Sequence, residues 1–146
     1  MYLLMRRLSA YTHDDLLLGV FGALESAERG RDAYVKAILV DGPDPHAEQL
    51  YHRVSPEDVR ILSDLPAFDV WPEPRVVFVV VSYSEAMGQG CIKLEAIHGD
   101  LERANEAAVA LEAEYDDEGF SMALRCFVEE VEVDRLSDGG GGRVLR

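Results

Sequence analysis

The sequence has little positive charge, few cysteines and no long apolar run, and each of these absences excludes a class of protein. There are 14 Lys and Arg side chains against 28 Asp and Glu, for a formal net charge of −14. A surface of this sign repels a phosphate backbone, so direct nucleic-acid binding is not expected. The longest apolar run, residues 76–81, is far shorter than the ~20 residues of a membrane helix, so no membrane span is expected.

The beginning of the chain and the cysteines indicate a cytoplasmic protein. The charges of Arg6 and Arg7 follow a very short apolar stretch, whereas a secretory signal has the opposite order and a longer apolar segment. Cys91 and Cys126 do not form a Cys-x-x-Cys pair, and both fall in predicted strands. We interpret them as small core residues, with a disulfide as the alternative if the two strands are neighbours.

The acidic residues are spread along the chain. Residues 1–73 carry 13 acidic and 7 basic side chains, and residues 74–146 carry 15 and 7. The chain is therefore not a folded domain with an acidic tail. Solubility explains such a surface most simply. A protein partner with a basic surface, or mimicry of nucleic acid, are the sharper alternatives.

An internal repeat is the most informative pattern. Residues 16–27 fall on residues 93–104 when shifted by 77, and both segments contain Gly-x-Leu-Glu-x-Ala. Further along the chain the shift becomes 74. We predict one domain, residues 1–136, made of two strand–strand–helix–strand (ββαβ) repeats. The repeats are residues 1–63 and 76–136, joined by a proline-rich linker at 64–75 and followed by a disordered glycine-rich tail at 137–146.

The predicted fold is α+β, with two pseudo-symmetric ββαβ units. They form an antiparallel or mixed sheet of about six strands with two helices on one face. Two small sheets packed at an angle are the alternative. The predicted elements are strands at 2–8, 15–21 and 47–54 around a helix at 24–38, and strands at 76–83, 91–98 and 122–133 around a helix at 101–115.

Both predicted helices are amphipathic. Asp100 is placed to cap the second helix. Gly30 in the first helix corresponds to Ala107 in the second, which predicts a close approach of the first helix to the sheet. The predicted apolar stripes are Leu24, Ala27, Tyr34, Val35 and Ile38 in the first helix, and Leu101, Ala104, Ala108, Leu111 and Tyr115 in the second.

Two further segments have local signals. Ser55-Pro56-Glu57-Asp58 is typical of a helix start and predicts a short helix or turn at residues 56–63. The last strand, residues 122–133, carries three glutamates, which is typical of an edge strand. Cys126 and Val128 are predicted on one face of it and Phe127 on the other.

No P-loop, dinucleotide fingerprint, Ser-His-Asp elbow or zinc motif is present, so we predict no catalytic residue, cofactor or metal site. The least ordinary stretch is the glycine-rich loop at residues 84–90, whose backbone amides could face an anion. The candidate ligand-binding residues are Tyr83, Glu85 and Gln89 near this loop, and Tyr11 and His13 in the corresponding loop of the first unit. His98 takes the place of Phe21 in the repeat, which indicates a packing residue.

Phe68 and Trp71 are two large apolar residues in the predicted linker. They either pin the linker across the joint between the units or anchor a partner, so we take them as candidate partner-binding residues. The function hypothesis is a non-catalytic protein-interaction or regulatory module, whose partner is a protein with a basic surface. The alternative is a small-molecule-binding protein or small enzyme with a cleft between the repeats. Neither the ligand nor the oligomeric state follows from the sequence.

Overall fold

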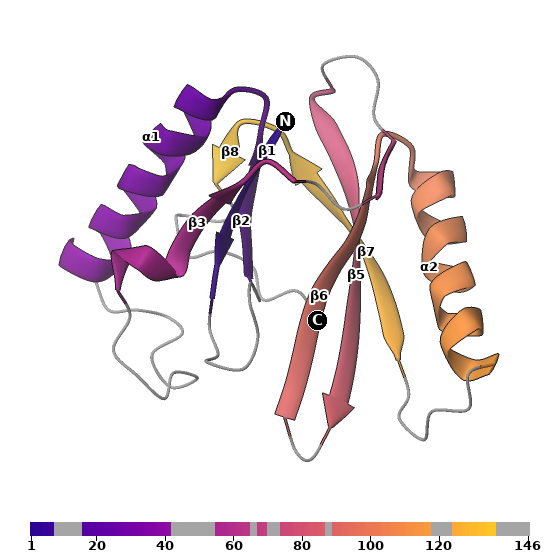
Figure 1. Ribbon diagram of the computed structural model, residues 1–146. Coiled ribbons are helices and arrows are strands. Elements are labelled where there is room, and N and C mark those ends of the chain that lie inside the picture. Colours follow the sequence, from indigo (N-terminus) through magenta and orange to yellow (C-terminus); the bar gives the residue numbers. More distant parts are fainter. Residues whose placement is uncertain are drawn as a thin grey trace. The chain divides into compact units, whose positions relative to one another are not determined.

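The computed structural model describes residues 1–7, 16–41, 55–64, 67–69, 74–86, 89–117 and 124–136. The fold is α+β, as predicted, and it divides into two compact units. The described residues of unit 1 come from 1–64 and 132–136, and those of unit 2 come from 65–131. The chain therefore leaves unit 1 once and returns to it with its last described residues (Figure 1).

Unit 1 is a four-stranded sheet covered by one helix. Its strand order is β3-β1-β2-β8, and β1 runs antiparallel to both β2 and β3. Helix α1 packs on β1, β2 and β3. The elements are β1 (Tyr2–Arg6), β2 (Leu16–Phe21), α1 (Leu24–Val35), a π-helical turn η1 (Lys36–Asp41), a 3-10 turn η3 (Pro56–Asp58), β3 (Val59–Leu62) and β8 (Arg135–Leu136).

Unit 2 also combines four strands with one helix. Its strand order is β4-β6-β5-β7, with β5 antiparallel to β6 and β4 parallel to β6. Helix α2 packs on β5 and β6 (Figure 1). The elements are β4 (Ala67–Asp69), β5 (Val76–Ala86), β6 (Gln89–His98), α2 (Leu101–Asp117) and β7 (Arg125–Glu132).

The described strands form two four-stranded sheets, not the single sheet of about six strands that we predicted. The reason is that the backbone hydrogen bonds are satisfied within each unit. Strand β1 lies between β3 and β2, and β5 lies between β7 and β6. Strand β8 pairs with β2 at Gly19, and β4 pairs with β6 over Ala96–His98, so each central hairpin finds its further partners within its own unit.

The strand boundaries around the linker also differ from the prediction. The predicted strand at 47–54 lies outside the described residues, and β3 forms within the segment predicted as a short helix or turn. Only one turn of helix forms there, because Val59 and Ile61 begin the alternating pattern of a half-buried strand directly after Asp58. The predicted linker contains the short strand β4. Strand β7 is at the edge of its sheet among the described strands, as predicted.

A β-bulge interrupts the central hairpin of each unit at the same place. In unit 1, Leu4 pairs with Gly19 and Met5 pairs with Leu17, so Leu18 is the extra residue. In unit 2, Val80 pairs with Ala96 and Val81 pairs with Leu94, so Glu95 is the extra residue. The two extra residues are 77 positions apart, which is the shift of the sequence repeat.

The two helices bury different amounts of apolar side chain against their sheets. The cluster under α1 contains Leu4, Leu16, Leu18, Phe21, Ala27, Tyr34, Ile38 and Val59. The buried cluster under α2 contains only Val80, Ala96, Ala104 and Ala108, with partly buried side chains around it. Cys126 and Val128 pack against this second cluster, on the predicted face of β7, and Phe127 on the other face is exposed.

The prediction that the first residue of each helix lies on the buried stripe is wrong. Leu24 is 46% exposed and Leu101 is 48% exposed. Side chains in a helix lean toward its N-terminus, so a residue in the first turn points back past the end of the sheet that the helix covers. The prediction of the Asp100 cap is confirmed, because its carboxylate accepts the backbone N–H of Arg103 at 3.1 Å.

The returning chain closes the turn before α1. The carboxylate of Asp134 accepts the backbone N–H of Gly22 at 2.9 Å, and the N–H of Asp134 donates to the carbonyl of Val20 at 2.7 Å. Asp134 has a φ of 61°, in the left-handed region that Asp and Asn tolerate better than other side chains. A residue far along the chain thus holds the strand–helix turn of unit 1.

Gly30 lies against the ring of Phe21, which confirms the predicted close approach. A Cβ on Gly30 would meet Cζ of Phe21 at 2.6 Å. We expect Gly30→Ala to destabilise unit 1 by about 1–2 kcal/mol, because overpacking outweighs the helix propensity of alanine. Urea denaturation measures this loss. The double variant Phe21→Leu/Gly30→Ala should recover the helix-propensity gain relative to Phe21→Leu alone, and equal losses in both backgrounds would contradict the contact.

Candidate functional site

The structure places only some of the predicted site residues. Tyr11, His13 and Trp71 lie outside the described residues. Phe68 is in β4, where it pairs with Ile97 in register. The predicted glycine-rich loop is mostly strand, because β5 extends to Ala86 and β6 begins at Gln89.

The remaining predicted residues lie at the tip of this hairpin. Glu85 pairs with Gly90 and Ala86 pairs with Gln89, so the backbone of Gly90 is engaged in the ladder. Tyr83 is partly buried and pairs with Ile92, one register position before the pair of Ser84 and Cys91. Most of the predicted loop is therefore strand, and its Met87 and Gly88 lie outside the described residues, so the anion site stays a prediction.

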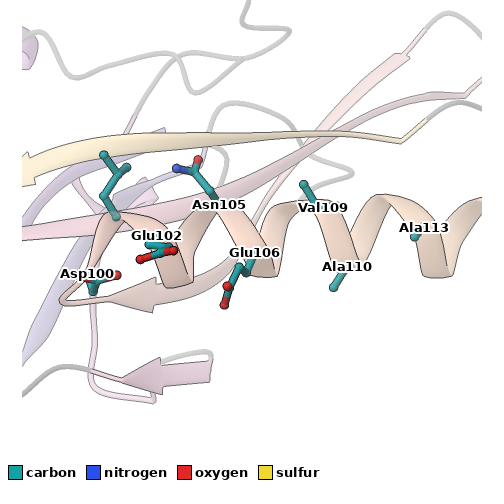
Figure 2. Close-up of a pocket in the computed structure, with 8 residues that line it drawn as sticks. Asp100, Glu102, Asn105, Glu106, Val109, Ala110 and Ala113 are labelled. Carbon is teal, nitrogen blue, oxygen red and sulfur yellow. The ribbon is translucent and has the colours of Figure 1, made fainter.

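A different surface has the features of a binding site: the side of α2 that faces away from its sheet. We call it the outer face of α2. It forms a shallow groove of about 810 Å³. Its residues are Asp100, Leu101, Glu102, Asn105, Glu106, Val109, Ala110 and Ala113 (Figure 2).

Apolar side chains occupy the length of the outer face, and acidic ones gather at its first two turns. Val109 is 68% exposed, the highest value among the exposed large apolar side chains of the described residues. Asn105 and Val109 point to the same side of the helix, whereas Glu106 and Ala110 point to the other (Figure 2). The fully buried residues of α2 are the small Ala104 and Ala108, with Ala107 and Leu111 partly buried beside them.

The charge of α2 is strongly one-sided. The helix carries six acidic side chains and one basic side chain, Arg103. Its last turn contains Asp116 and Asp117 and no basic residue. Carboxylates at a helix C-terminus are opposed by the helix dipole, so a nearby cation would be favourable there.

A second hollow lies at the sheet side of α2, around the bulge residue Glu95. We call it the bulge pocket. Its volume is about 320 Å³. It is lined by Ser82, Ser84, Lys93, Glu95, Leu111, Glu114, Tyr115 and Leu124.

The carboxylate of Glu95 is held on both oxygens. The Ser82 hydroxyl donates to Oε1 at 2.7 Å, and the Lys93 ammonium donates to Oε2 at 2.8 Å. The Glu95 side chain is 16% exposed, whereas that of Lys93 is 69% exposed. The carboxylate is therefore fixed in position while its counter-ion stays mostly in solvent.

Cys126 lies close to two carboxylates, those of Glu112 and Glu95. Its backbone N–H donates to the Glu112 carboxylate at 2.6 Å. Burial raises the pKa of the Cys126 thiol, and the charges of Glu112 and Glu95 raise it further. Cys126 is a free thiol that packs beside the apolar cluster of unit 2, as the sequence predicted.

His98 has buried ring nitrogens without partners. Within the described part of the chain, neither Nδ1 nor Nε2 has a hydrogen-bond partner. A buried polar group without a partner costs about 1–3 kcal/mol. The prediction of a packing role fits the placement of His98 opposite Phe78 in the hairpin register.

Replacing His98 with leucine should therefore stabilise the protein. We expect His98→Leu to raise the free energy of unfolding by about 1 kcal/mol, because an apolar side chain of similar size removes the unpaired nitrogens. Urea denaturation gives the measurement. His98→Gln retains the polar atoms and should give no such gain. A loss of stability in His98→Leu would indicate that the imidazole has a partner in solution.

Other kinds of site are not found among the described residues. No group of three or more His, Cys, Asp or Glu side chains there could hold a metal ion. No helix in the described ranges combines the length and the apolar character needed to cross a membrane. Comparison with known proteins gives no match to a family model, a curated protein or a solved structure.

Both surfaces have a signal in the sequence. Val109 and Ala113 are apolar residues off the buried stripe of α2, which is what an exposed apolar face requires. Glu95 occupies the position of Leu18 in the repeat, which marks a change from apolar to charged. The hairpin register places both residues at the bulge, so the two bulges differ in the charge of their extra residue.

Proposed function

We propose that the protein is a non-catalytic protein-interaction module, and that the outer face of α2 binds a basic, amphipathic helical segment of another protein. The observation that carries this proposal is the combination of exposed Val109 and Leu101 with the acidic first turns of the same helix face. Apolar residues in a groove with a charged rim are typical of helix-in-groove recognition.

The apolar part of the surface supplies the affinity. Leu101 and Val109 are two turns apart on α2, so apolar residues at helical spacing on a partner helix can contact both. Burying a side chain of the size of valine contributes about 1.5–3 kcal/mol. Ala110 and Ala113 are small, which lets a partner helix approach closely.

The charge of the surface selects the partner. Asp100, Glu102 and Glu106 lie along the groove, and the whole chain has a net charge of −14. An acidic partner would be repelled, and a partner with Lys or Arg beside its apolar residues would be attracted. A basic side chain near Asp116 would also offset the unfavourable position of this carboxylate at the helix end.

The test is the binding of a synthetic helical peptide in which leucines at helical spacing are flanked by lysines. We expect fluorescence anisotropy to show saturable binding that weakens with salt. Val109→Gln should weaken binding about tenfold through lost apolar contact. Glu106→Lys should weaken it by a similar factor through repulsion.

The matched control is Ala33→Gln on the exposed face of α1, which should leave the affinity unchanged. Equal affinity of Val109→Gln and the unaltered protein would contradict the proposal. So would equal binding of a peptide in which glutamates replace the lysines.

We also infer that the two units are duplicated ββαβ elements. In each, the third strand lies beside the first, the helix covers the central hairpin, and the hairpin has its bulge at corresponding residues, Leu18 and Glu95. Gly19 and Ala96, which follow the bulges, each pair with the fourth strand of their sheet. The fourth strands differ in direction, since β8 is antiparallel and β4 is parallel, so the correspondence is limited to the first three strands and the helix.

A further inference from the structure

We propose that the bulge pocket of unit 2 binds a small organic cation with an apolar body, such as a primary alkylamine. This site is independent of the proposed docking surface, because it lies at the sheet side of α2 and shares no lining residue with the outer face. Four features of the pocket favour such a ligand: the difference between its bulge residue and that of unit 1, its charge, its walls and its size.

The comparison with unit 1 shows what is unusual about the pocket. At the bulge of unit 1, Leu18 is fully buried within the apolar cluster under α1. At the bulge of unit 2, the corresponding residue is Glu95, with Lys93 two residues before it where unit 1 has buried Leu16. A position that fills a core in one unit thus places a carboxylate in a hollow of the other.

The pocket has an excess of negative charge. Glu95 and Glu114 line it together with one cation, Lys93. Glu112 directly follows the lining residue Leu111 in α2, and together with Glu95 it raises the pKa of the Cys126 thiol. Lys93 is mostly in solvent and donates to a single oxygen of Glu95, so the carboxylate keeps acceptor capacity for a second cation.

The walls of the pocket suit an aliphatic ammonium. Leu111 and Leu124 provide apolar surface, and Tyr115 adds an aromatic side chain to the lining. The Ser82 side chain is buried and holds Glu95 in place, so the carboxylate is ordered before a ligand arrives. The volume of about 320 Å³ lies at the lower end of the range for small-molecule pockets.

The experiment titrates the full chain with n-hexylammonium and follows backbone amide chemical shifts by NMR. We expect saturable shifts at residues 82–84, 93–95 and 111–115. The probes n-hexanol and hexanoate have the same apolar body without the positive charge, and neither should give saturable shifts at these residues. Equal binding of n-hexanol would overturn the proposal, and so would the absence of saturable shifts with n-hexylammonium.

Two substitutions in the pocket have opposite expected effects. Glu95→Gln should weaken binding about tenfold or more, because it removes a charge-assisted hydrogen bond. Lys93→Met should tighten binding several-fold, because it removes the competing cation and keeps the aliphatic stem. A merely structural role for this ion pair predicts no gain of affinity in Lys93→Met, so an unchanged or weaker affinity there would overturn the proposal.

Glu28→Gln on the exposed side of α1 is the matched control, since it removes the same charge outside the pocket and outside the outer face of α2. Its affinity for n-hexylammonium should equal that of the unaltered protein. If Glu28→Gln weakened binding as much as Glu95→Gln, the cation would be attracted by the general charge of the protein and the site would be refuted. The peptide experiment on Val109→Gln has a separate readout, so either proposal can fail alone.

Discussion

Replacing Leu18 with glutamate should unfold unit 1. The Leu18 side chain has no exposed surface, and it lies in the cluster with Leu4, Phe21 and Tyr34. The substitution removes about 1.5–3 kcal/mol of apolar burial and leaves a carboxyl group that must be buried or must break the packing of α1. We expect a loss of more than about 4 kcal/mol, which is a large part of the stability of a domain of this size.

The reciprocal substitution, Glu95→Leu, should cost less than about 1.5 kcal/mol, because it replaces a carboxylate that is paired and close to solvent by an apolar side chain of similar size. Urea denaturation combined with hydrogen exchange of the β1–β2 and β5–β6 amides would assign each change to its unit. Comparable losses in Leu18→Glu and Glu95→Leu would show that the two bulges are equivalent in environment, against the contrast on which the bulge pocket depends.

The second large effect should come from Asp58. Its side chain is 4% exposed and accepts a hydrogen bond from the Arg7 guanidinium at 2.9 Å. Its other oxygen accepts the backbone N–H of Ser55 at 3.0 Å, and its backbone carbonyl accepts the N–H of Arg7 at 2.9 Å. One residue therefore ties the end of β1 to the turn that begins β3.

Asp58→Ala removes both side-chain interactions. We expect a loss of about 3 kcal/mol, in which the local cap contributes about 1 and the charge-assisted bond to Arg7 the larger share. The Arg7 side chain is 40% exposed and can be rehydrated, so its loss of a partner costs less than that of a buried guanidinium would.

Glu57→Ala is the control for Asp58→Ala, since Glu57 is exposed in the same turn and should change the stability by less than about 0.5 kcal/mol. Urea denaturation measures both variants. Faster hydrogen exchange in β3 of Asp58→Ala would locate the effect. A loss equal to that of Glu57→Ala would mean that the Asp58 interactions do not stabilise the turn.

Two features of the helices were predicted correctly from the sequence: the cap at Asp100 and the close approach at Gly30. Asp100 caps α2 because a carboxylate before a helix finds the free amides of the first turn whatever else the chain does. Gly30 lies against Phe21 as its mismatch with Ala107 indicated. The helix prediction failed at Leu24 and Leu101, because periodicity alone does not give the position at which a helix passes the end of its sheet.

Features that depend on distant pairing were not predicted. The order of strands in a sheet follows from contacts between remote segments, so local patterns left two sheets as the alternative to the single sheet that we predicted. The return of Asp134 to Gly22 spans most of the chain. The outer face of α2 was not predicted, because helical periodicity identifies the stripe that packs on the sheet and Val109 lies off that stripe.

The most direct test of the proposed function is to map by NMR where the lysine-flanked helical peptide contacts the protein. If the outer face of α2 is the docking surface, the largest amide shift changes will lie between Leu101 and Ala113, and they will vanish with the glutamate-containing twin peptide. Shift changes centred on α1 or on β7, or changes of equal size with both peptides, would contradict it.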